Sequence, residues 1–119
     1  MKLEVGIYVR TKWGYICKII NINDFREPSM KYGVEASYLK DIMFIGDDDI
    51  LKASHNIIDL IEVGDYVNGL LVTRICEDNE TKEKYINLYG SVSEWEQEDI
   101  KSIVTKEMFS SVEYRMETD

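Results

Sequence analysis

Short runs of alternating apolar and polar residues fill most of this chain, and turns containing glycine or asparagine separate them. In LEVGIYVR, the side chains at every second position from Leu3 to Val9 are aliphatic, so they are predicted to lie on one face of a strand. No long run has helical periodicity, and the single proline, Pro28, lies in a polar stretch. This pattern is typical of a small all-β domain.

Two hairpins are predicted from their turn residues. The first occupies residues 3–22 and reverses direction at TKWG. The second reverses at Asn68-Gly69, because Asn-Gly is well suited to a two-residue turn that needs positive φ at both positions. This second turn should pair Asp65–Val67 with Leu70–Thr73.

The segment YINLYG returns from the polar tip of the second hairpin. Because side chains alternate between the two faces of a strand, Ile86 and Leu88 are expected to point toward the core. Tyr85, Asn87 and Tyr89 are then expected on the opposite face. Further strands are predicted at Val34–Leu39, Ile42–Ile45 and Val112–Met116.

One short helix is predicted near the C-terminus, over about Lys106–Ser111. Thr105 is a suitable N-cap, and Glu107 lies in the first turn, where the helix dipole favours a negative charge. Val104 and Phe109 have the spacing of a hydrophobic staple. The predicted fold class is therefore all-β and mainly antiparallel, a small SH3-like or related barrel with one short helix.

The composition agrees with a single folded domain that covers residues 1–119. Hydrophobic residues make up 45% of the chain and charged residues 31%, and eight tyrosines and two tryptophans exceed what a disordered chain carries. A chain of this size buries enough surface to need no disulfide or metal. Cys17 and Cys76 are therefore predicted to be free thiols.

The net charge of −9 is unevenly distributed. Residues 1–40 carry seven Lys and Arg against four Asp and Glu, a net +3, whereas residues 41–119 carry seven against nineteen, a net −12. Such an acidic surface repels duplex nucleic acid, whose affinity depends on phosphate neutralisation. An anionic ligand is therefore expected at the N-terminal third. No run approaches the roughly 18 apolar residues of a membrane span, and MKLEVGIYVR lacks the apolar core of a signal peptide.

No residue pattern in the chain points to catalysis or to a metal site. His55 is the only histidine, and the neighbouring Ser54 would point to the opposite face of a strand. Asp47–Asp49 lacks the alternating spacing and closing glutamate of a calcium loop, so a solvated turn is expected there. The protein is therefore predicted to be a non-enzyme without catalytic residues, metal or cofactor.

Cations and aromatic rings gather at the tip of the first hairpin, where Arg10, Lys12, Trp13 and Tyr15 lie within six residues. Guanidinium and aromatic faces together can hold a base by stacking and a phosphate by hydrogen bonds. The alternative is that Trp13 and Tyr15 cover the end of the barrel. Trp95, which lies among acidic residues, is likewise either a core residue or a contact for a partner.

Three segments, YVRTKWGYICKI, NIIDLIEVGDYVNG and IKSIVTKEMFSSVEY, resemble small proteins encoded by phages and prophages of low-GC Gram-positive bacteria. They keep their order and cover about a third of the chain. Small accessory proteins of such phages are often counter-defence factors, and one similar kind is the Thoeris anti-defence protein, an oligomeric sponge for cyclic ADP-ribose-type signals. The resemblance implies a phage protein that acts in the host bacterial cytoplasm.

The expected function is sequestration of a small cyclic nucleotide immune signal, of the cyclic ADP-ribose type, by a homo-oligomer that does not hydrolyse it. Two alternatives are an acidic anti-CRISPR-type inhibitor of a host nucleic-acid-binding defence complex and a phage accessory protein of structural role. No membrane or duplex nucleic acid partner is expected. The candidate ligand-binding residues are cations, rings and one amide: Arg10, Lys12, Trp13, Arg74, Tyr85, Asn87, Tyr89 and Arg115.

Overall fold

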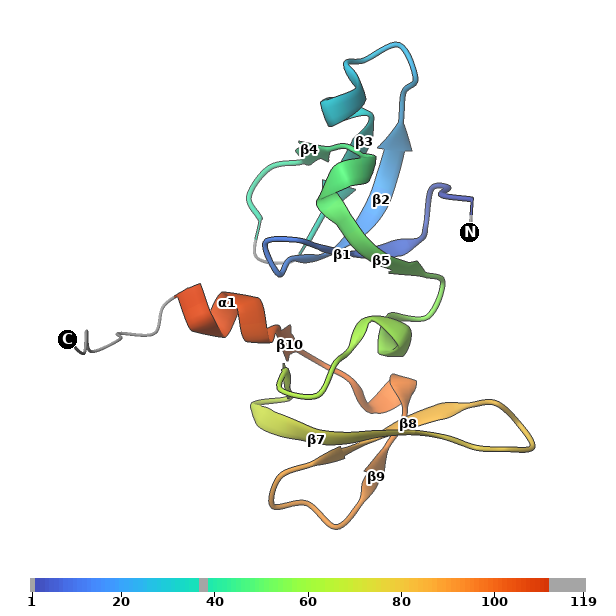
Figure 1. Ribbon diagram of the computed structural model, residues 1–119, viewed down its shortest axis with the longest axis vertical. Coiled ribbons are helices and arrows are strands. Elements are labelled where there is room, and N and C mark those ends of the chain that lie inside the picture. Colours follow the sequence, from blue (N-terminus) through green and yellow to red (C-terminus); the bar gives the residue numbers. More distant parts are fainter. Residues whose placement is uncertain (1, 37–38, 112–119) are drawn as a thin grey trace, which may run out of the picture.

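The structure, a computed structural model that describes residues 2–36 and 39–111, contains two five-stranded antiparallel sheets and one short α-helix (Figure 1). The first sheet has the order β4-β3-β2-β1-β5, formed by Met43–Ile45, Tyr32–Glu35, Ile16–Ile22, Tyr8–Thr11 and Ile50–Ser54. The second has the order β10-β6-β7-β8-β9, formed by Ile103–Val104, Tyr66–Val67, Leu70–Glu77, Lys84–Leu88 and Glu94–Trp95.

The predicted all-β class is confirmed, and the sheets carry only short helical segments. These are the 3₁₀ turns η1, η2, η3 and η4 and the helix α1, at Pro28–Met30, Asp47–Asp49, Ile57–Leu60, Gln97–Asp99 and Lys106–Ser111. Within the described residues neither sheet closes on itself, so two open sheets stand where one barrel was expected. No helix in this part of the chain is long and apolar enough to cross a membrane.

The two sheets repeat one plan. In each, four strands follow one another as a meander, the fifth strand pairs with the first, and a 3₁₀ turn, η2 or η4, precedes the fifth. The first strand is introduced by a nearly identical motif, EVGIYV at Glu4–Val9 and EVGDYV at Glu62–Val67. The chain is therefore a tandem repeat of a first unit, residues 4–54, and a second unit, residues 62–104.

Matching backbone hydrogen bonds support this repeat. The Gly6 N–H donates to the Ile19 carbonyl at 2.8 Å, and the Gly64 N–H donates to the Val72 carbonyl at 3.0 Å. The φ angles of the two glycines are 98° and 101°, a left-handed conformation that residues with a Cβ rarely adopt. The same residue type therefore forms the same bend at the same point of both units.

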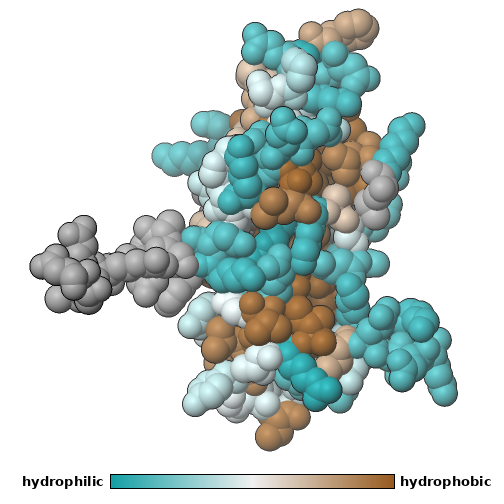
Figure 2. Space-filling view, in the orientation of Figure 1, coloured by the Kyte–Doolittle hydropathy of each residue, from teal (hydrophilic) through white to brown (hydrophobic). Residues whose placement is uncertain are grey.

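Each unit has its own hydrophobic core, and a polar layer lies between the two. The first core contains Ile7, Val9, Cys17, Ile19, Tyr32, Val34 and Ile45. The second contains Ile58, Ile61, Val67, Val72, Ile86 and Leu88. Figure 2 shows apolar surface over both units and a band of hydrophilic side chains across the middle of this face. The contact between the units is therefore predominantly polar.

The predicted turn and helix are both confirmed. Asn68 and Gly69 have φ angles of 52° and 81°, and the turn they form pairs Tyr66–Val67 with Leu70–Leu71. The helix begins at Lys106 as expected, and the Thr105 hydroxyl accepts the Met108 N–H at 3.4 Å, as an N-cap does.

Other local predictions were wrong or lie outside the described residues. Val5 is 61% exposed, because the left-handed Gly6 interrupts the alternation that was expected from Leu3 to Val9. The strand expected at Val34–Leu39 lies earlier, at Tyr32–Glu35. The strand predicted at Val112–Met116 and the side chain of Phe109 lie outside the described part of the chain.

Candidate functional site

Four of the predicted ligand-binding residues lie together on the outer face of the second sheet. Arg74 on β7 is paired with Asn87 on β8, and Tyr85 and Tyr89 lie two positions to either side of Asn87. The aliphatic residues between them are buried in the second core, so the polar and aromatic side chains face outward, as the alternation predicted. Arg74 is exposed and Tyr89 is 71% exposed.

Glu94 on β9 extends this face, because β8 pairs Asn87 with Glu94. Directly paired residues point to the same face of a sheet, so Arg74, Asn87 and Glu94 form a row across three strands, which we call the polar row. The usual strand spacing places the two ends of the row about 10 Å apart. Sequence reasoning missed Glu94, although the apolar Trp95 beside it indicates that Glu94 points outward.

The pKa of the Tyr85 phenol depends on both ends of the polar row, Arg74 and Glu94. Its pKa is raised, first by hydrogen bonding and charge interaction with the Cys76 thiol, then by desolvation and by Glu94, whereas Arg74 lowers it. The Cys76 thiol also lies 3.9 Å from the Asn87 Oδ1, to which it donates. A cation, an anion, an amide and two phenol rings thus share one solvent-facing surface.

Lys12 and Trp13 lie elsewhere, at the turn between β1 and β2 of the first sheet. The Lys12 Nζ is 3.0 Å from the Asp49 carboxylate and 5.0 Å from the centroid of the Trp13 ring. A cavity of about 600 Å³ beside Lys12 is otherwise bordered by Glu27–Ser29 and Gly46–Asp49, a predominantly acidic lining. This end of the first unit is therefore poorly suited to a phosphate, contrary to the expectation that an anionic ligand meets the N-terminal third. Lys12 and Trp13 do not join the candidate residues on the second sheet.

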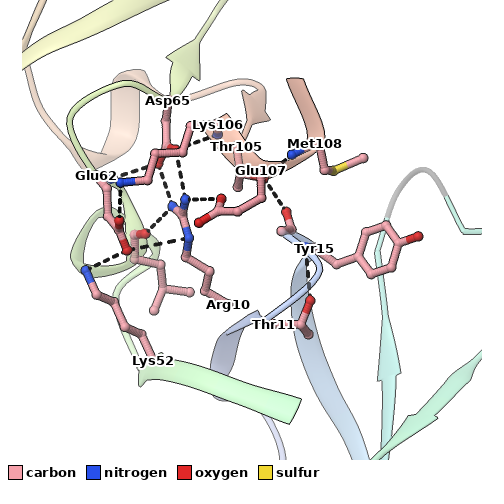
Figure 3. A network of polar contacts seen from close by, with 12 residues as sticks. Arg10, Thr11, Tyr15, Lys52, Glu62, Asp65, Thr105, Lys106, Glu107 and Met108 are labelled. Carbon is pink, nitrogen blue, oxygen red and sulfur yellow. Dashed lines mark hydrogen bonds and ion pairs between the residues drawn. The ribbon is translucent and has the colours of Figure 1, made fainter. Parts of the chain in front are cut away.

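Arg10 is a structural residue, which corrects its prediction as a ligand-binding one. Its side chain is 0% exposed and reaches from β1 to the second unit (Figure 3). The guanidinium donates to both Asp65 carboxylate oxygens, at 2.5 and 2.9 Å, to Glu107 at 2.6 Å and to the Leu60 carbonyl at 2.9 Å. Burial alone lowers its pKa, but the hydrogen bonds and charges of Asp65 and Glu107 outweigh burial, so the pKa is raised.

Six charged side chains, three of each sign, form this joint between the units: Arg10, Lys52, Glu62, Asp65, Lys106 and Glu107. A Lys106 hydrogen bond at 2.7 Å is the main reason that the pKa of Glu62 falls to about 2; burial opposes the shift, and Lys52 and Arg10 add to it. The Thr105 hydroxyl also donates to the Gly14 carbonyl at 2.6 Å, which ties α1 to the first unit. The joint is electrically balanced, and burial keeps a ligand phosphate from Arg10, including the Nε donor, which has no hydrogen-bond partner among the described residues.

The remaining candidates have structural explanations, except for Arg115, which lies outside the described residues. Trp95 is half-buried and packs against the second core, in agreement with the core alternative, and its Nε1 donates to the Ser91 hydroxyl at 3.1 Å. His55 is exposed and lies 3.5 Å from Glu4. Cys17 and Cys76 are thiols that form no disulfide, as predicted. The described residues contain no group of three or more His, Cys, Asp or Glu side chains that could hold a metal ion.

An acidic groove of about 550 Å³ lies where the β7–β8 loop, η3 and η4 meet. Its lining includes five carboxylates against two lysines: Asp59, Glu77, Glu83, Glu96 and Glu98 against Lys82 and Lys84. The pKa of Glu96 is raised, first by hydrogen bonding to Glu98 and by repulsion from its charge. Such a groove repels an anion and attracts a cation.

No protein-family model, curated protein or solved structure matches this chain. The structure offers two candidate sites, the outer face of β7–β8–β9 and the acidic groove.

Proposed function

We propose that this protein is a binding protein, without catalytic activity, that sequesters a small nucleotide immune signal on the outer face of β7–β8–β9. The observation that carries the proposal is the convergence of Arg74, Tyr85, Asn87 and Tyr89 on one face of the second sheet. The resemblance to phage counter-defence proteins supplies the biological setting, and cyclic ADP-ribose-type molecules are the signals it implies. Assembly into a homo-oligomer stays a prediction.

The chemistry of this face favours a nucleotide over other small anions. The rings of the exposed Tyr89 and the half-buried Tyr85 offer stacking surfaces, and base–aromatic stacking contributes about 1–3 kcal/mol per base. Arg74 supplies a planar, permanently charged group that binds a phosphate through two parallel hydrogen bonds. One arginine is enough to bind the phosphate of a small ligand, whereas a long polyanion would also contact the acidic rest of the surface and be repelled by it.

Calorimetry with cyclic ADP-ribose and with a cyclic oligonucleotide tests the proposal. We expect at least one to bind more tightly than about 10 μM, which corresponds to about −7 kcal/mol. The ligand should be recovered chemically intact after the protein is denatured. If neither signal nor any mononucleotide binds at this level, or if the ligand is recovered as a hydrolysed product, the proposal is wrong.

A matched pair of variants locates the binding site. Tyr89→Ser removes an exposed ring from the proposed face and should weaken binding about 5- to 150-fold, the range given by the loss of one stacking contact. Phe25→Ser removes a fully exposed ring from the first unit and should leave the affinity unchanged. Equal effects of the two substitutions would place the ligand elsewhere.

The acidic groove favours a second candidate function, inhibition of a basic partner protein. Its five carboxylates could accept lysine and arginine side chains of a host nucleic-acid-binding protein. Because such contacts are largely between charges near the surface, this binding would weaken steeply as the salt concentration rises. Binding of a basic peptide, with no nucleotide binding, would favour this second function.

A further inference from the structure

The tandem repeat gives the polar row a direct counterpart in the first unit. Both units have a register shift at the same place, after Ile19 on β2 and after Val72 on β7. The residues that follow are paired across three strands in each case. The row Asn21–Gly33–Phe44 of the first unit therefore corresponds to the row Arg74–Asn87–Glu94 of the second.

The counterpart row is already occupied by a side chain of the protein itself. The Arg26 guanidinium lies 4.7 Å from the centroid of the Phe44 ring, and its Nη2 donates to the Asn21 Oδ1. Gly33 lies at the middle of this row, where a Cβ would meet the Asn21 Cβ at 3.2 Å and the Phe44 ring at 3.4 Å. In the first unit, the Arg26 guanidinium, a planar group with N–H donors along its edge, thus covers the outer face of the row.

The second unit exposes the corresponding row instead of covering it. Arg74 and Glu94 are exposed, Asn87 is half-buried between them, and Tyr89, two positions after Asn87, is 71% exposed. A carboxylate accepts hydrogen bonds and donates none, so Glu94 selects a ligand edge that carries N–H donors. Guanine presents two adjacent donors, N1–H and the N2 amino group, whereas adenine presents an acceptor at N1.

We infer that the polar row prefers a guanine nucleotide, with Glu94 accepting from the N1–H and N2 amino groups and Arg74 binding the phosphate. This inference rests on the proposed function and narrows its ligand class to guanine-containing nucleotide signals, in place of the adenine-containing cyclic ADP-ribose type. The two ends of the row are about 10 Å apart. The base edge and the phosphate of a nucleoside monophosphate are separated by a similar distance. Tyr85 or Tyr89 would stack on the base between these ends.

Calorimetric titration with GMP, IMP and AMP tests the inference, because the three differ at the base edge and share the sugar and phosphate. We expect GMP to bind at least tenfold more tightly than AMP, with IMP, which lacks the N2 amino group, between them. Glu94→Gln should reduce the GMP-to-AMP preference to less than threefold. The ratio is the relevant quantity, since removing a negative charge strengthens phosphate binding for all three nucleotides alike.

Glu80→Gln, which removes an exposed carboxylate from the β7–β8 loop, is the matched control and should preserve the preference. Equal affinities for GMP and AMP would overturn the inference while leaving the proposed function intact, as would a preference that survives Glu94→Gln. If no nucleotide binds and an arginine-rich peptide does, the row receives a partner's arginine, and both the inference and the proposed function are wrong.

Discussion

Replacing Asp65 by Asn is expected to destabilise the protein by about 3–5 kcal/mol, the usual cost of leaving one partner of a buried ion pair uncompensated. Asp65 is fully buried, and its carboxylate accepts two hydrogen bonds from Arg10. It also accepts the backbone N–H groups of Glu62 and Lys106, at 2.7 and 2.9 Å. The amide of asparagine would place an N–H group against these donors and leave the Arg10 charge unbalanced.

Urea denaturation at neutral pH measures this effect, with Asp24→Asn as the control. The Asp24 side chain is 78% exposed and lies 3.3 Å from Lys31, an arrangement typical of surface pairs that contribute about 0–1 kcal/mol. If Asp65→Asn destabilises the protein no more than Asp24→Asn, the buried joint does not hold the two units together. A separate early transition for one unit would indicate that the joint had opened.

Gly14→Ala is expected to have the second largest effect, about 2–5 kcal/mol. The φ angle of Gly14 is 91°, and a left-handed conformation costs a residue with a Cβ about 1–2 kcal/mol. A Cβ would also lie 2.5 Å from the Thr105 Oγ1 and 2.9 Å from the Glu107 Cβ, and overpacking of this kind costs about 1–3 kcal/mol. The start of α1 would have to move away from the first unit.

Gly90→Ala separates these two contributions. Gly90 has a similar φ angle of 80°, but a Cβ there meets no atom within 4 Å among the described residues. It should therefore show only the conformational cost. The difference between the two variants, measured by urea denaturation, reports the contact of α1 with the β1–β2 turn. Equal losses of stability would mean that this contact contributes nothing.

Local patterns predicted the parts of the fold that depend on neighbouring residues. The Asn68-Gly69 turn followed from the φ angles its two residues tolerate, and α1 followed from the Thr105 cap. The outward direction of Tyr85, Asn87 and Tyr89 followed from strand alternation. Each of these features is determined within a few residues, so no knowledge of distant contacts was needed.

Features that depend on distant pairing could not be derived in the same way. Arg10 meets Asp65 across 55 positions, and a cationic side chain near an aromatic tip has the same local pattern whether it is buried or exposed. The number of sheets depended on noticing that EVGIYV recurs as EVGDYV, a signal that is present in the sequence. Within that repeat, Asp65 replaces the core residue Ile7, and this replacement is what gives Arg10 its partner.

The most direct test of the account is a titration of the ¹⁵N-labelled protein with GMP, followed by NMR. We expect the backbone amide signals of the polar row and of Tyr85 and Tyr89 to shift progressively with GMP concentration; the row consists of Arg74, Asn87 and Glu94. The corresponding row of the first unit, Asn21, Gly33 and Phe44, should stay unchanged because Arg26 already covers it. Shifts confined to the β1–β2 turn or to the acidic groove, or no shifts at millimolar GMP, would contradict the account.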